Sequence, residues 1–194
     1  MNNYFEEILK SINRAINSMD MIQFERLVDE CKETLSRGNK IVVSGLGKNV
    51  PVCDKFVGTM NSMGLRASFM NTNSAVHGDL GIVENGDLVI VLTKSGETAE
   101  SIYLTKWLKE RNVDLWLLTF CKESTLTREI PNSVVLSLDN EGDAWDIVPN
   151  NSTTINLIVL QGVAITLAER MGVTLHDFKM NHPGGHIGVQ LKNE

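Results

Sequence analysis

The sequence has few of the features that mark secreted, metal-binding or membrane proteins. Its 194 residues include only three cysteines, Cys31, Cys53 and Cys121, which lie too far apart for a C-x-x-C pair. Because their number is odd and no secretory apolar segment begins the chain, we expect a cytoplasmic protein with reduced cysteines that serve in packing. No apolar run is as long as a membrane-spanning segment, so we expect no membrane insertion.

Signs of nucleic-acid or nucleotide binding are also missing. The 18 basic residues are outnumbered by 24 acidic ones and are scattered, which gives a formal net charge of -6 and predicts no nucleic-acid partner. Neither the Walker motif G-x-x-x-x-G-K-[ST] nor the dinucleotide motif G-x-G-x-x-G occurs. What remains is the composition of an ordinary globular protein, long enough for one domain with a substantial core.

The first part of the chain predicts two helices. Apolar residues recur at helical spacing over residues 3–36, with a break near Met19-Asp20 and a helix stop at Gly38. We therefore expect a single domain over residues 1–194, in which residues 1–37 form a helical pair that packs on the rest.

From residue 40 onwards, short apolar runs alternate with helical segments. The predicted strands cover residues 40–45, 66–70, 87–92, 114–120 and 133–138, and the predicted helices cover residues 47–63, 98–112 and 152–172. Continuous apolar strands that alternate with helices indicate an α/β fold with a parallel sheet covered on both faces. Ligands of such sheets bind at the carboxyl ends of the strands.

Hydroxyl side chains and glycines gather at these strand ends, directly before helices. They are Ser44 and Gly45 after the first strand, Thr93, Ser95, Gly96 and Thr98 after residues 87–92, and Ser152 at the head of the long helix. One such set is best explained as helix capping. Three sets in one parallel sheet favour a phosphate site, because helix N-termini attract anions and glycine allows close backbone approach.

Charged residues lie beside these turns. Lys48, Glu100 and Glu141 are ordinary surface charges when taken singly, and their position beside the predicted phosphate site makes them candidates for catalysis. His77, in the segment HGDLG, titrates near neutrality and can exchange protons with a substrate. A loop histidine bonded to backbone is the simpler explanation when that segment is considered alone.

Two further histidines, His182 and His186, have the spacing of a metal pair on a helix. Pro183 and two glycines between them disfavour a continuous helix, and no nearby Cys or Asp completes a ligand set. We therefore expect no metal site.

Five segments together resemble the sugar isomerase (SIS) domain family, and within it the arabinose 5-phosphate isomerase group. They are VVSGLGK (42–48), HGDLG (77–81), SGETAE (95–100), VPNNSTT (148–154) and HPGGHIG (182–188). HGDLG followed by HPGG-x-x-G is typical of this group, whereas SGE-[TS] marks only the wider superfamily. The resemblance implies a three-layer α/β/α sandwich with a five-stranded parallel sheet, a homotetramer, and a sugar phosphate as ligand.

The resemblance also assigns roles to residues. It implies that the hydroxyls of Ser44, Thr93, Ser95, Thr98 and Ser152 hold phosphate, and that Lys48, His77, Glu100, Glu141 and His182 form the active site. Aldose–ketose isomerisation moves a proton between C1 and C2 through an enediolate, without metal or cofactor. Glu141 or His77 would be the base, His182 a ring-opening or oxygen-proton shuttle, and Lys48 the cation beside the developing charge. His182 would complete the site of a neighbouring subunit.

The chain departs from the family pattern in several places. We expect no counterpart of the cystathionine-β-synthase-type modules that follow in many members. Asn49 replaces the serine of G-K-S, and Lys94 replaces a neutral residue. These differences leave the substrate open. The leading hypothesis is an isomerase of ribulose 5-phosphate and arabinose 5-phosphate. The alternatives are an isomerase of a hexulose or amino-sugar phosphate and a non-catalytic sugar-phosphate sensor.

Overall fold

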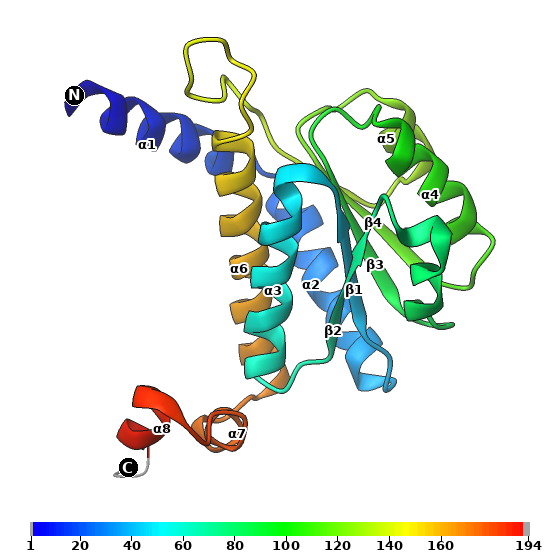
Figure 1. Ribbon diagram of the computed structural model, residues 1–194, viewed down its shortest axis with the longest axis vertical. Helices are drawn as coiled ribbons and strands as arrows, with labels where there is room; N and C mark the ends of the chain where they lie inside the picture. Colours follow the sequence, from blue (N-terminus) through cyan, green and yellow to red (C-terminus); the bar gives the residue numbers. More distant parts are fainter. Residues whose placement is uncertain (1, 192–194) are drawn as a thin grey trace.

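A parallel five-stranded sheet between two layers of helices forms the centre of the protein, as seen in the computed structural model, which describes residues 2–191 (Figure 1). The strands are β1 (Ile41–Gly45), β2 (Ala67–Asn71), β3 (Leu88–Thr93), β4 (Asp114–Thr119) and β5 (Ser133–Val135). They pair in the order β2-β1-β3-β4-β5, and every pairing is parallel. The expected three-layer α/β/α sandwich with five parallel strands is confirmed.

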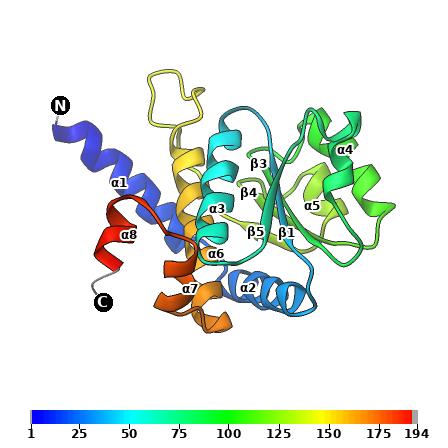
Figure 2. The ribbon, with the colours of Figure 1, turned by 60° about the horizontal axis from the view of Figure 1, so that its bottom comes forward.

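Helices cover both faces of this sheet (Figures 1 and 2). One face carries α2 (Met21–Ser36), α3 (Val50–Ser62) and α6 (Asn151–Met171), and the other carries α4 (Ala99–Lys109) and α5 (Thr125–Glu129). The remaining helices are α1 (Asn2–Asn17), α7 (Leu175–Met180), α8 (Gly185–Leu191) and the short 3-10 turns η1 (Gly47–Asn49), η2 (Ala75–His77) and η3 (Asp79–Ile82).

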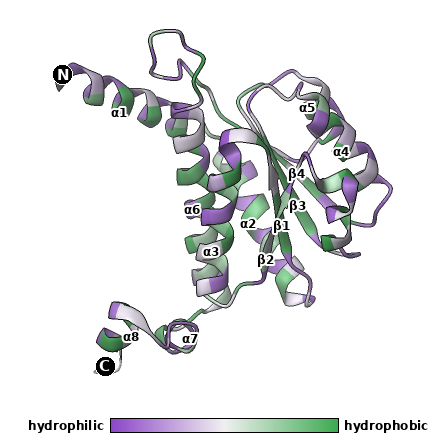
Figure 3. Ribbon diagram, in the orientation of Figure 1, coloured by the Kyte–Doolittle hydropathy of each residue, from purple (hydrophilic) through white to green (hydrophobic). Residues whose placement is uncertain are grey.

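The two central strands, β1 and β3, are buried at every position. Alternate side chains point to opposite faces of a strand, so each strand supplies both cores. Val43 and Ile90 belong to the core that includes α2, α3 and α6, whereas Val42 and Val89 belong to the core that includes α4. This two-sided burial explains why the strands read as continuous apolar runs, which appear green in Figure 3.

The long helix α6 is the central helix of its layer. It contacts α1, α2 and α3, and ten of its residues are buried. By length and composition alone it is apolar enough to cross a membrane, so the expectation that no such run exists was wrong. Because 56% of its most apolar window is buried inside the protein, α6 has the character of a core helix, and the composition is weak evidence for a membrane span.

Helix α1 packs against α6 mainly through its second half. Ser11 and Ala15 are buried there, whereas Tyr4, Phe5 and Leu9 are exposed on the half that projects from the body in Figure 1. Asp20 begins α2 by accepting hydrogen bonds from two amides of its first turn, at the predicted break between the helices. Residue 1 of the expected helical pair and residues 192–194 of the expected domain lie outside the described residues.

Candidate active site

A pocket lies where the strand order of the sheet reverses. The connections after β1 and β3 diverge at this point, which is where open parallel sheets bind their ligands. The pocket has a volume of about 240 Å³. Its lining residues are Leu46, Gly47, Lys48 and Asn49 after β1, Leu92, Thr93, Lys94 and Thr98 around the end of β3, and Pro149, Ser152, Thr153 and Asn156 at the start of α6. The structure thus brings Lys48, Thr93, Thr98 and Ser152 together from the predicted set.

The turn between β3 and α4 presents two threonine hydroxyls. The Gly96 amide donates to Thr93 Oγ1 at 3.2 Å, and the Thr93 and Thr98 hydroxyl oxygens are 3.5 Å apart. Thr98 is the N-cap residue of α4, yet within residues 2–191 its side chain makes no capping hydrogen bond. Capping therefore does not explain Thr98, and its hydroxyl and the first-turn amides of α4 can serve an anion.

Four other residues predicted for the phosphate site, Ser44, Gly45, Ser95 and Gly96, are not lining residues of the pocket. Ser44 is completely buried, and its hydroxyl pairs with that of Thr72 at 3.0 Å. A Cβ at Gly45 would lie 2.9 Å from Asn49 Cβ, so this glycine lets the next turn approach the strand. Ser95 is exposed and accepts a hydrogen bond from the amide two residues later, as in a local turn.

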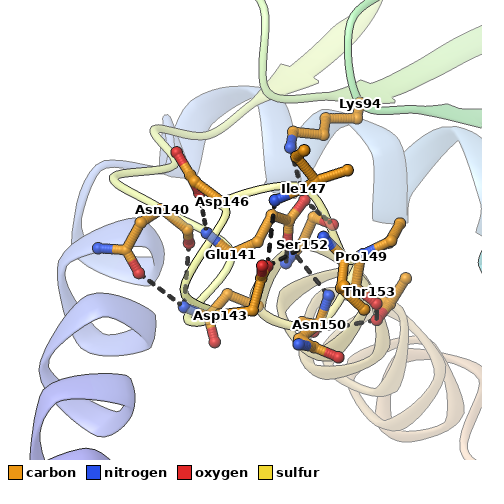
Figure 4. A network of polar contacts seen from close by, with 12 residues as sticks. Lys94, Asn140, Glu141, Asp143, Asp146, Ile147, Pro149, Asn150, Ser152 and Thr153 are labelled. Carbon is orange, nitrogen blue, oxygen red and sulfur yellow. Dashed lines mark hydrogen bonds and ion pairs between the residues drawn. The ribbon is translucent and has the colours of Figure 1, made fainter.

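Glu141, in the loop before α6, is not a lining residue and is fully buried, and Figure 4 shows its polar contacts. Its Oε1 accepts from Lys94 Nζ at 2.7 Å and from Ser152 Oγ at 2.8 Å. Its Oε2 accepts from the amides of Ser152 at 2.9 Å and Asn150 at 3.1 Å. Burial raises the pKa of this carboxyl, but the hydrogen bonds from Lys94 and Ser152 outweigh burial and hold the pKa below its usual range.

Lys94 and Asn156 are among the lining residues that the sequence does not mark as site residues. The family resemblance gives Lys94 only as a departure, although its position between Thr93 and Ser95 places it at the predicted site. Asn156 lines the pocket while only 1% exposed, and its Nδ2 donates to Asn49 Oδ1 at 3.0 Å. Among the described residues its Oδ1 has no partner, which is unusual for a buried polar atom.

Besides Glu141, three predicted catalytic residues are not among those that line the pocket of their own chain. His77 at the end of η2 and Glu100 in the first turn of α4 are exposed and are not lining residues. His182 follows α7, beyond the far end of α6, a helix about 30 Å long. Its Nδ1 lies 2.8 Å from the Phe178 carbonyl oxygen, and the two rings stack at 3.9 Å. Figure 1 shows this C-terminal segment at one end of α6, opposite the loop that precedes the helix.

The segment between His182 and His186 is not a continuous helix, as Pro183 and the two glycines predicted. His182 follows α7, whereas His186 lies in α8, which begins at Gly185. In the part of the chain that the structure describes, no group of three or more His, Cys, Asp or Glu side chains is placed to hold a metal ion.

Comparison with known proteins gives consistent matches to sugar isomerases. A family model described as SIS domain matches residues 34–168. The chain is 34% identical to arabinose 5-phosphate isomerase KdsD of Pseudomonas aeruginosa over 91% of its own length and 54% of that protein. It is 31% identical to the KdsD of Escherichia coli CFT073 over 96% of its length and 57% of that protein. The chain thus spans a little over half of the length of these relatives.

Solved structures agree with this match. A protein of E. coli CFT073 in complex with arabinose 5-phosphate has a TM-score of 0.85 and is 32% identical, with 94% of this chain and 95% of that chain covered. NanR of Vibrio vulnificus, complexed with ManNAc-6P, has a TM-score of 0.71 at 17% identity over 93% of this chain and 65% of its own, which shows the shared fold alone. The family resemblance in the sequence is confirmed, and the chain belongs to the SIS domain family.

Proposed function

We propose that the protein is a phosphosugar aldose–ketose isomerase that interconverts ribulose 5-phosphate and arabinose 5-phosphate. The observation that carries this proposal is the pocket between β1, β3 and α6. It combines the hydroxyls of Thr93 and Thr98, a helix N-terminus and the two lysines Lys48 and Lys94, and none of the described residues that line it is acidic. The choice of reaction and of sugar rests on the arabinose 5-phosphate isomerases among its relatives.

In this proposal the phosphate binds at the N-terminus of α4 and the sugar carbons extend towards α6. A base removes the proton from C2 of the aldose or C1 of the ketose, and the resulting enediolate is reprotonated on the other carbon. The ammonium of Lys48 stabilises the negative charge on the enediolate oxygens. The buried acceptor of Asn156 suits a sugar hydroxyl, which can donate a hydrogen bond where a phosphate oxygen cannot.

The proton-transfer groups come from more than one chain in this proposal. We propose a homotetramer in which His182 completes the pocket of a neighbouring copy, and in which His77 and Glu100 also belong to the assembled site. The distance of His182 from its own pocket supports this arrangement. Exposed apolar side chains on α1 and on the loop before α6 offer area for contact between copies; they are Tyr4, Phe5, Leu9, Trp145 and Ile147. As an enzyme that acts on small sugar phosphates, the protein would act in the cytoplasm.

A non-catalytic sugar-phosphate sensor is the second candidate. The position of His77, Glu100 and His182 outside the pocket of a single chain favours it, because binding a phosphate needs no proton relay. An isomerase of a hexulose or amino-sugar phosphate would use the same pocket with a different sugar.

The test is turnover of a panel of pentose, hexulose and amino-sugar phosphates by the purified protein, with the variants Lys48→Met and Lys106→Met. We expect ribulose 5-phosphate to be converted to arabinose 5-phosphate, and Lys48→Met to lower kcat/KM by about 10²-fold or more. Lys106→Met removes the same charge from an exposed site in the last turn of α4 and should match the wild type. Binding of sugar phosphates without turnover of any would favour the sensor.

A further inference from the structure

We propose that Lys94 is a substrate-binding residue whose ammonium group holds the phosphate, and that Glu141 is a positioning residue that acts through Lys94. This inference rests on the proposed function only in taking a phosphorylated ligand. It assigns a binding role to a residue that the family resemblance treats as a departure.

The backbone of Lys94 is held firmly while its side chain reaches the pocket. Its carbonyl oxygen accepts from the Phe120 amide and from the Thr119 hydroxyl, both at 3.2 Å, which fixes the turn to the end of β4. Lys94 lines the pocket together with Thr93 and Thr98, and its side chain is 46% exposed. Lys94 is therefore half-exposed at the same pocket as the two hydroxyls suited to an anion.

Glu141 determines where that ammonium group lies. Three donors besides Lys94 hold its carboxylate, namely the Ser152 hydroxyl and the amides of Ser152 and Asn150. Its own amide donates to Asp146 Oδ1 at 2.6 Å, so the backbone is anchored as well (Figure 4). A lysine on a long flexible stem is thereby given one position.

Exposure and hydrogen bonding explain why Lys94 is assigned to binding and Glu141 to positioning. Glu141 is fully buried, and both of its oxygens are occupied by two donors each, so it is poorly placed to take a proton from carbon. The Lys94 ammonium carries three N–H groups, of which one meets Glu141, so two can meet a ligand. Lys48 lies in the same pocket, so a bound sugar phosphate would meet two cations, with Lys94 at the phosphate and Lys48 at the enediolate oxygens.

The test measures dissociation constants for inorganic phosphate and for arabinose 5-phosphate by calorimetry, with the variants Lys94→Met, Lys94→Arg and Lys106→Met. Losing a charge-assisted hydrogen bond weakens binding by about ten- to a hundredfold. Lys94→Met should therefore raise the dissociation constants of both ligands to this extent. Lys94→Arg keeps the charge and should recover most of the affinity. Lys106→Met, the matched loss of one surface charge, should bind as the wild type does.

A double-mutant cycle tests the positioning role. Glu141→Gln should weaken phosphate binding in the wild-type background and have no further effect in the Lys94→Met background, because Glu141 acts only through Lys94. The double variant also removes the buried carboxylate that Lys94→Met alone leaves short of a partner, so binding can be measured even if the single variant folds poorly.

The outcomes separate this inference from the proposed function. Unchanged phosphate affinity in a folded Lys94→Met protein, or no phosphate binding by the wild type, would overturn the inference even if the wild type isomerises a sugar phosphate. Lys94-dependent phosphate binding by a protein that turns over no sugar phosphate would support it while refuting the isomerase.

Discussion

The turn that carries Thr93 and Thr98 depends on a glycine that no other residue can replace without strain. Gly96 has a φ of +68°, and a Cβ built there would lie 2.0 Å from Ser124 Oγ and 2.6 Å from Ser124 Cβ. Ser124 is buried and caps α5 by accepting from the Thr127 amide at 3.1 Å. Gly96→Ala therefore adds a strained backbone conformation and displaces a helix cap in one step.

The two effects can be estimated separately. An L-residue in the left-handed region costs about 1–2 kcal/mol, and loss of a serine cap costs about 1 kcal/mol, with an upper value near 2 kcal/mol. Their sum predicts that the free energy of unfolding falls by about 2–4 kcal/mol. For a chain of this size, this corresponds to a fall in Tm of roughly 4–16 °C. Thermal and urea unfolding of the purified variant measure both quantities.

Gly58 offers a matched control. It lies exposed within α3, and a Cβ there would meet nothing within 4 Å. Gly58→Ala should therefore raise stability by about 0.5–1 kcal/mol, because alanine favours the helix. A Gly96→Ala protein as stable as the wild type would refute the reasoning about this turn.

Two further expectations concern titration and thiol chemistry. The folded state lowers the pKa of Glu141, so its contribution to stability is present above the unfolded pKa of about 4.3 and is lost as pH falls through the lower folded value. In urea unfolding from pH 6 to 3, the free energy of unfolding should therefore decline less for Glu141→Gln than for the wild type. Parallel curves would contradict this. Burial raises the pKa of Cys31 and raises that of Cys53 to about 12. A thiol reagent at pH 8 should therefore modify only the partly exposed Cys121 in the folded protein, which mass spectrometry of the labelled peptides can check. Rapid labelling of either buried thiol would contradict this expectation.

The sheet could be read from the sequence because its strands are buried on both faces. β1, β3 and β4 give continuous apolar runs, and their observed bounds agree with the predicted ones to within about a residue. The last strand was predicted over residues 133–138, but pairing ends at Val135. The short helices α5 and α7 were not predicted, since each is about one turn long and shows little periodicity. α7 did have a readable signal, the capping box formed by Thr174 and Asp177.

The site could be predicted only in part. The rule that parallel strands bind ligands at their carboxyl ends brought Lys48, Thr93 and Thr98 to one pocket. The pairing of Lys94 with Glu141 could not be read, because it depends on how the loop before α6 folds over the end of β3. No local pattern shows that Ser44 is completely buried and that its hydroxyl pairs with that of Thr72, just after β2. No local pattern shows that His182 lies beyond the far end of a 21-residue helix either.

Proton NMR of the purified protein with ribulose 5-phosphate in D₂O tests the proposed isomerase most directly. We expect arabinose 5-phosphate to appear with deuterium at C2, since a base that exchanges with solvent delivers the proton to the enediolate. A Lys48→Met sample should show little of this product, and a Lys106→Met sample should match the wild type. The isomerase would be contradicted if ribulose 5-phosphate stayed unchanged and free of deuterium. If ribulose 5-phosphate still protected the protein against thermal unfolding, the remaining account would be a sugar-phosphate-binding protein.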